Sequence, residues 1–166
     1  MTRIKVITDP VDLVIIIHAV NTEEKKRVFQ DLTTDWLTPT QIKKKYNEKG
    51  LEALYLLDKL KLVESRWQTN SENVSEKAYH TFFEAFQVNI TTPIMDITDI
   101  MATISMPDKD FIKLEKKIED YVGDTWKFYT DIAKDLNISK TMVKGISKRS
   151  TKLDVKGHKI GKIEPL

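Results

Sequence analysis

The segment from Thr130 to Ile146 constrains the fold more than any other part of this chain of 166 residues. Apolar residues recur at helical spacing on both sides of Asn137, which predicts two short helices joined by a tight turn. Asn137 tolerates the left-handed backbone that such a turn requires, and Thr130 and Ser139 are suitable N-terminal caps. The segment therefore predicts a helix-turn-helix, whose packed residues are Ile132, Ala133, Leu136, Ile138, Val143 and Ile146.

The second helix of this motif is basic. When its apolar residues pack inward, the outward positions are Lys140, Thr141, Met142, Lys144, Gly145 and Lys148. A helix that enters the DNA major groove needs short polar and basic residues there. The alternation over 153–163, around Lys156-Gly157-His158, then predicts a β-hairpin wing. Phosphate contacts are predicted for Lys148, Arg149, Lys152, Lys156, Lys159 and Lys162.

The charge distribution leaves two interpretations open. Residues 139–166 carry eight Lys or Arg and two Asp or Glu, whereas residues 69–138 carry seven against thirteen. A basic segment beside an acidic one is typical of a surface that binds a polyanion. A solvated lysine-rich surface gives a similar composition, because only four of the 27 basic residues are Arg.

The N-terminal part of the chain predicts three helices followed by a hairpin. Caps and apolar spacing place the helices at 22–32, 39–46 and 51–60, the second opened by Thr38-Pro39. Residues 62–67 indicate a strand, 69–71 a turn and 73–75 a short return strand. This order is that of a winged helix-turn-helix.

The middle of the chain predicts further helices. Aromatic spacing from Tyr79 to Phe86 fits a helix with one buried face. A second helix is opened by Thr92-Pro93 and closed by Met106-Pro107, and a third is capped by Asp108. These helices present more apolar surface than one small domain needs. Dimerisation is our preferred explanation, and packing between two domains is the alternative.

A resemblance to a known family rests on residues 38–66, with Pro39, Ile42, Leu54, Leu57 and the run Leu60-Lys61-Leu62-Val63-Glu64-Ser65-Arg66. This stretch resembles the winged helix of ArsR-type transcriptional regulators. The longer arrangement is similar to euryarchaeal ArsR-like regulators with a second helix-turn-helix; it runs from Asp9-Pro10-Val11-Asp12-Leu13-Val14 through Tyr79-His80-Thr81 to Lys148-Arg149-Ser150 and Val155-Lys156-Gly157. The resemblance implies a regulator that binds double-stranded promoter or operator DNA. One such regulator activates the operon of the archaellum, which makes that operon a candidate target.

One departure from the family pattern concerns metals. Metal-sensing members carry cysteine in the recognition helix, and this chain has none, so thiolate metal sensing is excluded. His18, His80 and His158 are too scattered to form a replacement site. We therefore expect no metal and no cofactor.

A second departure concerns the first recognition helix. Its start, residues 47–53, contains Glu48 and Glu52, which would repel phosphates. We therefore expect the second helix-turn-helix to read bases and the first unit to contribute wing and backbone contacts. The residues assigned to those contacts are Lys43, Lys44, Lys45, Arg66 and Gln68.

Other classes of protein lack support in the sequence. A Gly-rich phosphate loop, Gly-x-Ser-x-Gly and His-Glu-x-x-His are absent, so an enzyme is not indicated. The longest apolar stretch, 13–20, is interrupted by His18 and is too short for a membrane span. The first residues do not resemble a signal peptide. We therefore expect a cytoplasmic protein without a membrane partner.

These patterns together predict a mainly α fold with small β-hairpin wings, in which two winged helix-turn-helix units are joined by a helical region. The predicted boundaries are 1–90 for the ArsR-like unit, 91–122 for the linker and dimerisation region, and 123–166 for the C-terminal unit. The predicted function is sequence-specific DNA binding by a homodimeric transcriptional regulator that also contacts the transcription machinery. The alternative is a winged-helix protein-interaction module of that machinery without specific DNA binding.

Overall fold

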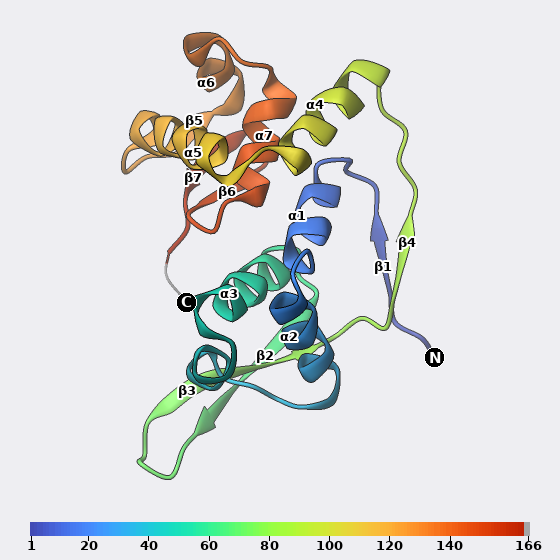
Figure 1. Cartoon of the computed structure of the whole chain (residues 1–166), viewed down its shortest axis with the longest axis vertical. Helices are drawn as coiled ribbons and strands as arrows, with labels where there is room; N and C mark the ends of the chain where they lie inside the picture. Colours follow the sequence, from blue (N-terminus) through green and yellow to red (C-terminus); the bar gives the residue numbers. More distant parts are fainter. Residues whose placement is uncertain (165–166) are drawn as a thin grey trace. The chain divides into compact units, whose positions relative to one another are not determined.

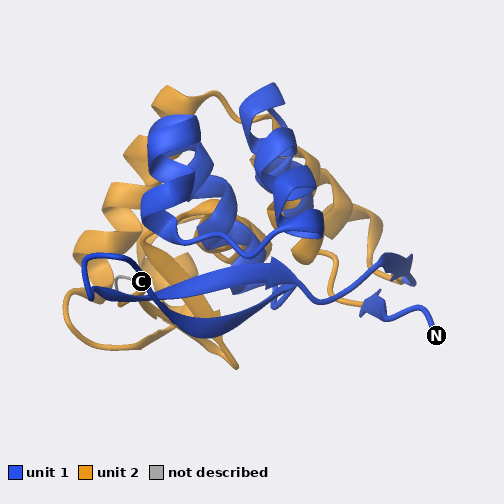
Figure 2. Ribbon diagram, turned by 90° about the horizontal axis from the view of Figure 1, so that it is seen from below, with its two compact units in different colours: residues 1–7, 16–89 blue, residues 8–15, 90–166 orange. Residues whose placement is uncertain are grey.

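The computed structural model describes residues 1–164, which divide into two compact units (Figures 1 and 2). The first unit comprises residues 1–7 and 16–89, and the second comprises 8–15 and 90–164. Residues 91–122, predicted as a separate linker, fall within the second unit in this division. Helices combine with small sheets in an architecture consistent with a winged helix. Within residues 1–164, no helix has both the length and the apolar character to cross a bilayer.

In the first unit, helices precede an antiparallel hairpin. Its elements are β1 (Ile4–Ile7), α1 (Asp12–Ala19), α2 (Glu23–Thr34), α3 (Pro39–Lys59), β2 (Val63–Thr69), β3 (Ser75–Thr81) and β4 (Ala85–Val88). The division between the units falls inside α1, whose residues 16–19 belong to the first. β2 pairs antiparallel with β3, and β1 pairs in parallel with β4. Fully buried side chains of this unit include Val28, Leu32, Ile42, Leu54 and Leu57.

A kink at Asn47 divides α3 into two helical segments, 39–46 and 48–59. Asn47 has a φ of 58° and a ψ of −157°, a backbone conformation that only glycine adopts without strain. The first segment begins with a capping box, in which Thr38 and Gln41 exchange side-chain-to-backbone hydrogen bonds. At Gly50, an added Cβ would lie 2.6 Å from the Cβ of Tyr46. Glycine therefore permits the close crossing of the two segments.

The return strand of the hairpin lies further along the chain than the sequence indicated. The strand predicted at 73–75 is confirmed only at Ser75, where β3 begins, because residues 70–74 form the turn. Asn73 has a φ of 58°, and the Asn70 side chain accepts hydrogen bonds from the backbone N–H groups of Glu72 and Val74. Asparagine side chains commonly stabilise turns in this way.

The helix predicted over residues 79–86 is also wrong. Tyr79 lies in β3 and exchanges two backbone hydrogen bonds with Leu37, at 2.8 and 3.0 Å. Phe86 lies in β4, opposite Lys5 of β1. The aromatic spacing that suggested one helix therefore runs across two strands and the connection between them.

Lys61 occupies a left-handed position directly after α3. Its φ is 57°, and its N–H donates to the carbonyl oxygen of Asp58. Glycine is favoured at such positions, because other residues carry a steric cost there. Lys61→Gly is therefore expected to raise the free energy of unfolding by about 0.5 kcal/mol in urea denaturation. Lys59→Gly, inside the last turn of α3, should instead lower it by up to about 1 kcal/mol. Destabilisation by both substitutions would contradict strain at Lys61.

The second unit combines helices with a three-stranded sheet of order β5-β7-β6. Its elements are α4 (Ile94–Ser105), α5 (Asp108–Val122), β5 (Lys127–Phe128), α6 (Tyr129–Leu136), α7 (Lys140–Arg149), β6 (Leu153–Lys156) and β7 (Lys159–Lys162). Pro107 holds the cap position of α5 that the sequence assigned to Asp108. The buried core includes Ile118, Val122, Ile132, Val143, Ile146, Leu153 and Ile160. A Cβ at Gly161 would overlap the Trp126 ring, so glycine allows that ring to lie against β7.

The turn between α6 and α7 matches the sequence prediction. Asn137 is left-handed, with φ 54° and ψ 47°, and the Ser139 hydroxyl caps α7 by accepting a backbone N–H at 3.0 Å. The cap predicted for the first helix is wrong, because Phe128 precedes α6 and Thr130 lies inside it. The hairpin predicted after α7 is confirmed as β6 and β7, which turn at Gly157 with a φ of 59°.

Candidate nucleic-acid interface

The face of α7 predicted to read bases is covered by other parts of the second unit. Within residues 140–149, Lys140 alone is exposed, and Lys144 is half-buried. The outward orientation predicted for Met142, Gly145 and Lys148 is wrong, because α4 and the start of α1 pack on that face (Figure 1).

Side chains of α4 contact α7 directly. The Thr141 hydroxyl donates to the Asp96 carboxylate at 3.2 Å, and the Thr103 hydroxyl lies 3.2 Å from the sulfur of Met142. A Cβ at Gly145 would lie 2.8 Å from the Thr103 hydroxyl oxygen, so glycine permits this close approach. The surface expected to enter the groove is therefore a helix–helix contact.

Arg149 ties the end of α7 to the end of α4. Its Nη1 donates to the carbonyl oxygens of Met106 at 2.7 Å and Thr103 at 3.3 Å. Its Nη2 lies 2.8 Å from the Asp108 carboxylate, and its guanidinium lies over the Phe111 ring. The side chain is only 7% exposed. Its charge is therefore committed to the fold and is not placed to meet a phosphate.

Lys148 and Lys152 also face carboxylates. The Nζ of Lys148 lies 3.1 Å from Asp12, and both side chains are largely buried. The Nζ of Lys152 lies 3.9 Å from Glu115 and 3.8 Å from Glu119, but the lysine side chain is 58% exposed. Glu115 is only 7% exposed, but at these distances a solvated ammonium group gains little from either carboxylate. Lys148 is therefore directed into the fold, whereas Lys152 stays accessible.

Lysines and aromatic rings lie together on the part of the second unit formed by β5, the β6–β7 hairpin and the neighbouring ends of α6 and α7. We call this set the lysine–aromatic surface; its members are Lys144, Lys156, Lys159, Trp126, Phe128 and Tyr129. Each lysine Nζ lies 4.8–5.1 Å from the centroid of one ring. Cation–π contacts of this kind orient an ammonium group and leave its charge in place.

The lysines of this surface remain available to a polyanion. Within residues 1–164, none of the three pairs with a carboxylate. The sequence indicated all three lysines as contact residues but none of the three rings. No local pattern marked these rings, because Phe128 meets Lys159 only through the pairing of β5 with β7.

In the first unit, the lysines predicted to contact the DNA backbone differ in their availability. Lys43 pairs with Glu48 and Lys45 pairs with Asp31, each at 2.7 Å. Lys44 is exposed and has no carboxylate partner within residues 1–164. Lys44 is therefore the most accessible cation of the three.

The two glutamates expected to repel phosphates both have cationic partners. Glu48 pairs with Lys43, and Glu52 lies 2.8 Å from the Nζ of Lys25. Lys25 is buried and also donates to the carbonyl oxygen of His18 at 3.0 Å. These ion pairs weaken the repulsion that the sequence indicated.

Arg66 and Gln68 are exposed on the same strand, β2. The Arg66 guanidinium lies 4.1 Å from the ring centroid of Trp36, and the His80 ring stacks on the same indole. Trp67, between the two predicted contact residues, is 70% exposed. The hairpin thus presents a cation, an amide and an aromatic ring to solvent.

Asp31 attaches the first segment of α3 to α2. The Tyr46 hydroxyl and the Lys45 ammonium donate to the same carboxylate oxygen of Asp31, at 2.6 and 2.7 Å. Burial raises the pKa of Asp31, but the hydrogen bonds from Lys45 and Tyr46 outweigh it, so the pKa lies below its ordinary value. Burial and the bond to Asp31 raise the pKa of Tyr46, and the bond to Asp31 raises the pKa of Lys45.

Tyr46→Phe is expected to lower the free energy of unfolding by about 1 kcal/mol at neutral pH. The pKa of Asp31 is lower in the folded protein than in the unfolded chain. Its contribution to the free energy of unfolding is therefore complete above the unfolded pKa, and it is lost as the pH falls through the folded pKa. The pKa values of Tyr46 and Lys45 are higher in the folded protein than in the unfolded chain. Their contributions to the free energy of unfolding are therefore complete below the unfolded pKa values, and they are lost as the pH rises through the folded pKa values. Urea denaturation should therefore show the largest difference near neutrality and a smaller one near pH 3. A double-mutant cycle with Asp31→Asn gives the coupling free energy between Tyr46 and Asp31. A coupling free energy that does not change with pH would contradict this assignment.

The described residues give no support for a metal site. Within residues 1–164, no group of three or more His, Asp or Glu could hold a metal ion. The three histidines have separate surroundings. His18 forms a hydrogen bond with the Asn21 side chain, His80 stacks on Trp36, and His158 forms a hydrogen bond with the Tyr129 hydroxyl.

Comparison with known proteins connects this geometry to a family. The family model described as ArsR transcriptional regulator matches residues 7–164. The match includes the helices and hairpin of the first unit and those of the second. A search of curated proteins gave no match.

Proposed function

Because the chain belongs to the ArsR family of transcriptional regulators, we propose that it binds specific promoter or operator sequences in double-stranded DNA. Family membership carries the role of DNA-binding transcriptional regulator. Sequence specificity, the contact residues and the oligomeric state are our proposals.

We infer two winged helix-turn-helix units, one in each compact unit. In the first, the two segments of α3 form the helix-turn-helix and β2–β3 the wing. In the second, α6 and α7 form the helix-turn-helix and β6–β7 the wing. The left-handed residues Asn47 and Asn137 support this inference, because each lies where one helix turns into the next.

We assign base reading to the first unit, which reverses the expectation from sequence. α7 offers only its edge at Lys140 and Lys144, because α4 and the start of α1 cover its other outward positions. The second segment of α3 exposes Glu48, Lys49 and Glu52 in its N-terminal half. Lysine can donate to guanine and glutamate can accept from cytosine in the major groove. Lys49 is a contact residue that the sequence argument missed.

Phosphate contacts are assigned to both units. In the first unit they fall to Lys44, Arg66 and Gln68; in the second they fall to Lys140, Lys152 and the lysine–aromatic surface. The observation that carries the proposal is the availability of its cations: within residues 1–164, Lys144, Lys156 and Lys159 have no carboxylate partner. Unpaired cations can each replace a counterion on a phosphate.

Selection of genomic fragments by the purified protein, followed by titration, tests the proposal. Fluorescence anisotropy should show binding to the selected duplex at least about 1,000-fold tighter than to a random duplex. Affinity for both duplexes should fall steeply with salt. Equal and salt-insensitive binding to both would contradict the proposal and favour a protein-interaction module.

We also propose a homodimer, formed through apolar side chains of α4 and α5. Ile94, Met95, Met101 and Ile112 are 56–82% exposed. Ile94 and Met101 are seven residues apart in α4 and so share a face of this helix, and apolar side chains exposed together commonly mark an interaction site. Light scattering should give twice the chain mass, and Ile94→Glu combined with Met101→Glu should give the monomer mass. Val74→Glu, at an exposed position of the first unit, is the control. A wild-type monomer would contradict the proposal.

A further inference from the structure

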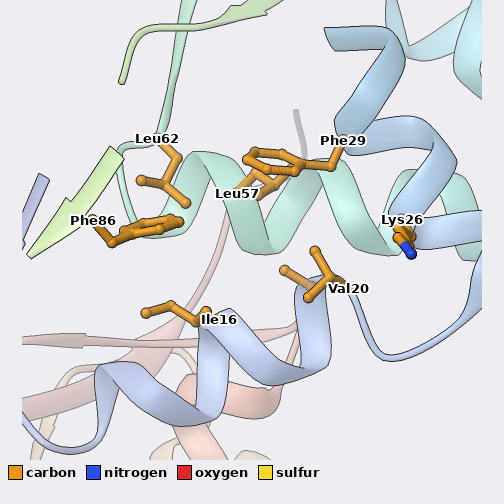
Figure 3. Close-up of a pocket in the computed structure, with 8 residues that line it drawn as sticks. Ile16, Val20, Lys26, Phe29, Leu57, Leu62 and Phe86 are labelled. Carbon is orange, nitrogen blue, oxygen red and sulfur yellow. The ribbon is translucent and has the colours of Figure 1, made fainter. Parts of the chain in front are cut away.

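The first unit contains an apolar cavity of about 450 Å³ between α1, α2, the end of α3 and β4 (Figure 3). Its walls include Ile16 and Val20 beside Phe29, Leu57 and Phe86. This volume lies within the range of small-molecule sites, about 300–1,000 Å³. The cavity is therefore large enough for a ligand.

Lys26 gives the cavity a charged end. Figure 3 shows Lys26 at one end and Phe86 at the other, with apolar side chains between them. Within the described chain, Lys26 is the one charged residue that lines this cavity, and it has no carboxylate partner. Its neighbour Arg27, by contrast, lies 3.5 Å from Glu23. The cavity thus offers an ammonium group to a ligand whose remainder is apolar.

Phe86 also borders a neighbouring cavity. A second cavity of about 220 Å³ shares Phe29, Leu62 and Phe86 with the first. Glu84 lines this second cavity, so the surroundings of Phe86 do not favour a negative charge. An elongated ligand is therefore favoured with its anionic end at Lys26 and its apolar end toward Phe86.

We propose that this cavity binds an amphipathic anion with a linear hydrocarbon chain, of which a medium-chain fatty acid is the simplest example. The carboxylate pairs with Lys26, and the chain packs against Leu57 and Leu62. Leu57 lies on the second segment of α3, and Leu62 directly precedes β2. The ligand therefore contacts the helix to which the proposed function assigns DNA binding and the residue that leads into the wing. A regulatory effect of the ligand rests on that proposed function, whereas binding itself does not.

Isothermal titration with octanoate, decanoate and decanol tests binding. Each added methylene should tighten binding about fourfold, so decanoate should bind about 15-fold more tightly than octanoate. Decanol, which lacks the charge, should bind less tightly than decanoate. Absence of decanoate binding overturns the proposal.

Matched variants test the location. Val20→Trp should fill the cavity and weaken decanoate binding at least about tenfold, whereas Ile17→Trp, at an exposed position of the same helix that does not line the cavity, should not. Lys26→Gln should weaken binding of decanoate but not of decanol, and Arg27→Gln should change neither. Thermal melting verifies that each variant is folded. Unchanged decanoate binding in folded Val20→Trp or Lys26→Gln overturns the site.

Titration of the selected duplex with and without saturating decanoate tests the regulatory effect. A change in DNA affinity of about fivefold or more is expected. Unchanged DNA affinity overturns regulation but leaves the binding site. Decanoate binding without any DNA binding would count against the proposed function alone, and DNA binding without decanoate binding against this site alone.

Discussion

Replacing Arg149 by methionine is expected to lower the free energy of unfolding of the second unit by about 3 kcal/mol. Methionine fills much of the same volume but donates no hydrogen bond to Thr103 or Met106. A buried carbonyl that loses its partner costs about 1–3 kcal/mol. The lost contact with Phe111 adds to this cost, whereas Asp108 is exposed and returns to water easily.

Fluorescence can isolate this effect. Trp36→Phe and Trp67→Phe would leave Trp126 as the probe of the second unit during urea denaturation. Lys140→Met is the matched control, because Lys140 is exposed on the same helix, and it should change stability by less than about 0.5 kcal/mol. A loss of DNA affinity in Arg149→Met without a loss of stability would restore the phosphate contact that the sequence indicated.

The turns of the second unit could be predicted because their causes are local. Asn137 and Gly157 adopt the left-handed backbone that their residue types permit, and Ser139 caps the helix that begins one residue later. Each of these interactions involves neighbours within a few residues. A sequence read in short windows therefore contains the information that fixes them.

The surroundings of α7 could not be predicted in this way. Its polar face looked like a solvent or DNA face, because Thr141, Lys148 and Arg149 are polar and Gly145 is small. The partners that cover this face come from α4 and from the start of α1, far away in sequence. Arg149 is satisfied by carbonyl groups near the end of α4, where cations are favoured. Residue polarity does not distinguish this arrangement from exposure.

For a related reason, the lysines of the lysine–aromatic surface could be predicted from the sequence, whereas its aromatic rings could not. Lys156 and Lys159 stand out in sequence because they flank the hairpin turn at Gly157. Their aromatic partners depend on pairing between distant strands, in which Phe128 of β5 lies opposite Lys159 of β7. Strand register of this kind is set by the whole unit, so Phe128 carried no local sign of its place.

Replacing both Lys156 and Lys159 by glutamine is expected to weaken duplex binding about 50-fold at 0.1 M salt. Each phosphate contact contributes about 0.9 to the slope of log affinity against log salt, so losing two contacts should reduce the slope by about 1.8. The preference for operator over random duplex should stay nearly constant, because phosphate contacts carry no base information. Anisotropy titrations at several salt concentrations measure all three quantities.

The matched control replaces Lys113 and Lys117 of α5 by glutamine, which removes the same charge at exposed positions outside the lysine–aromatic surface. If the cations over the rings contact phosphates directly, the control should lose far less affinity and keep the wild-type salt slope. Equal losses in both double variants would show that net charge alone attracts the duplex, and would contradict the assignment of contacts to Lys156 and Lys159.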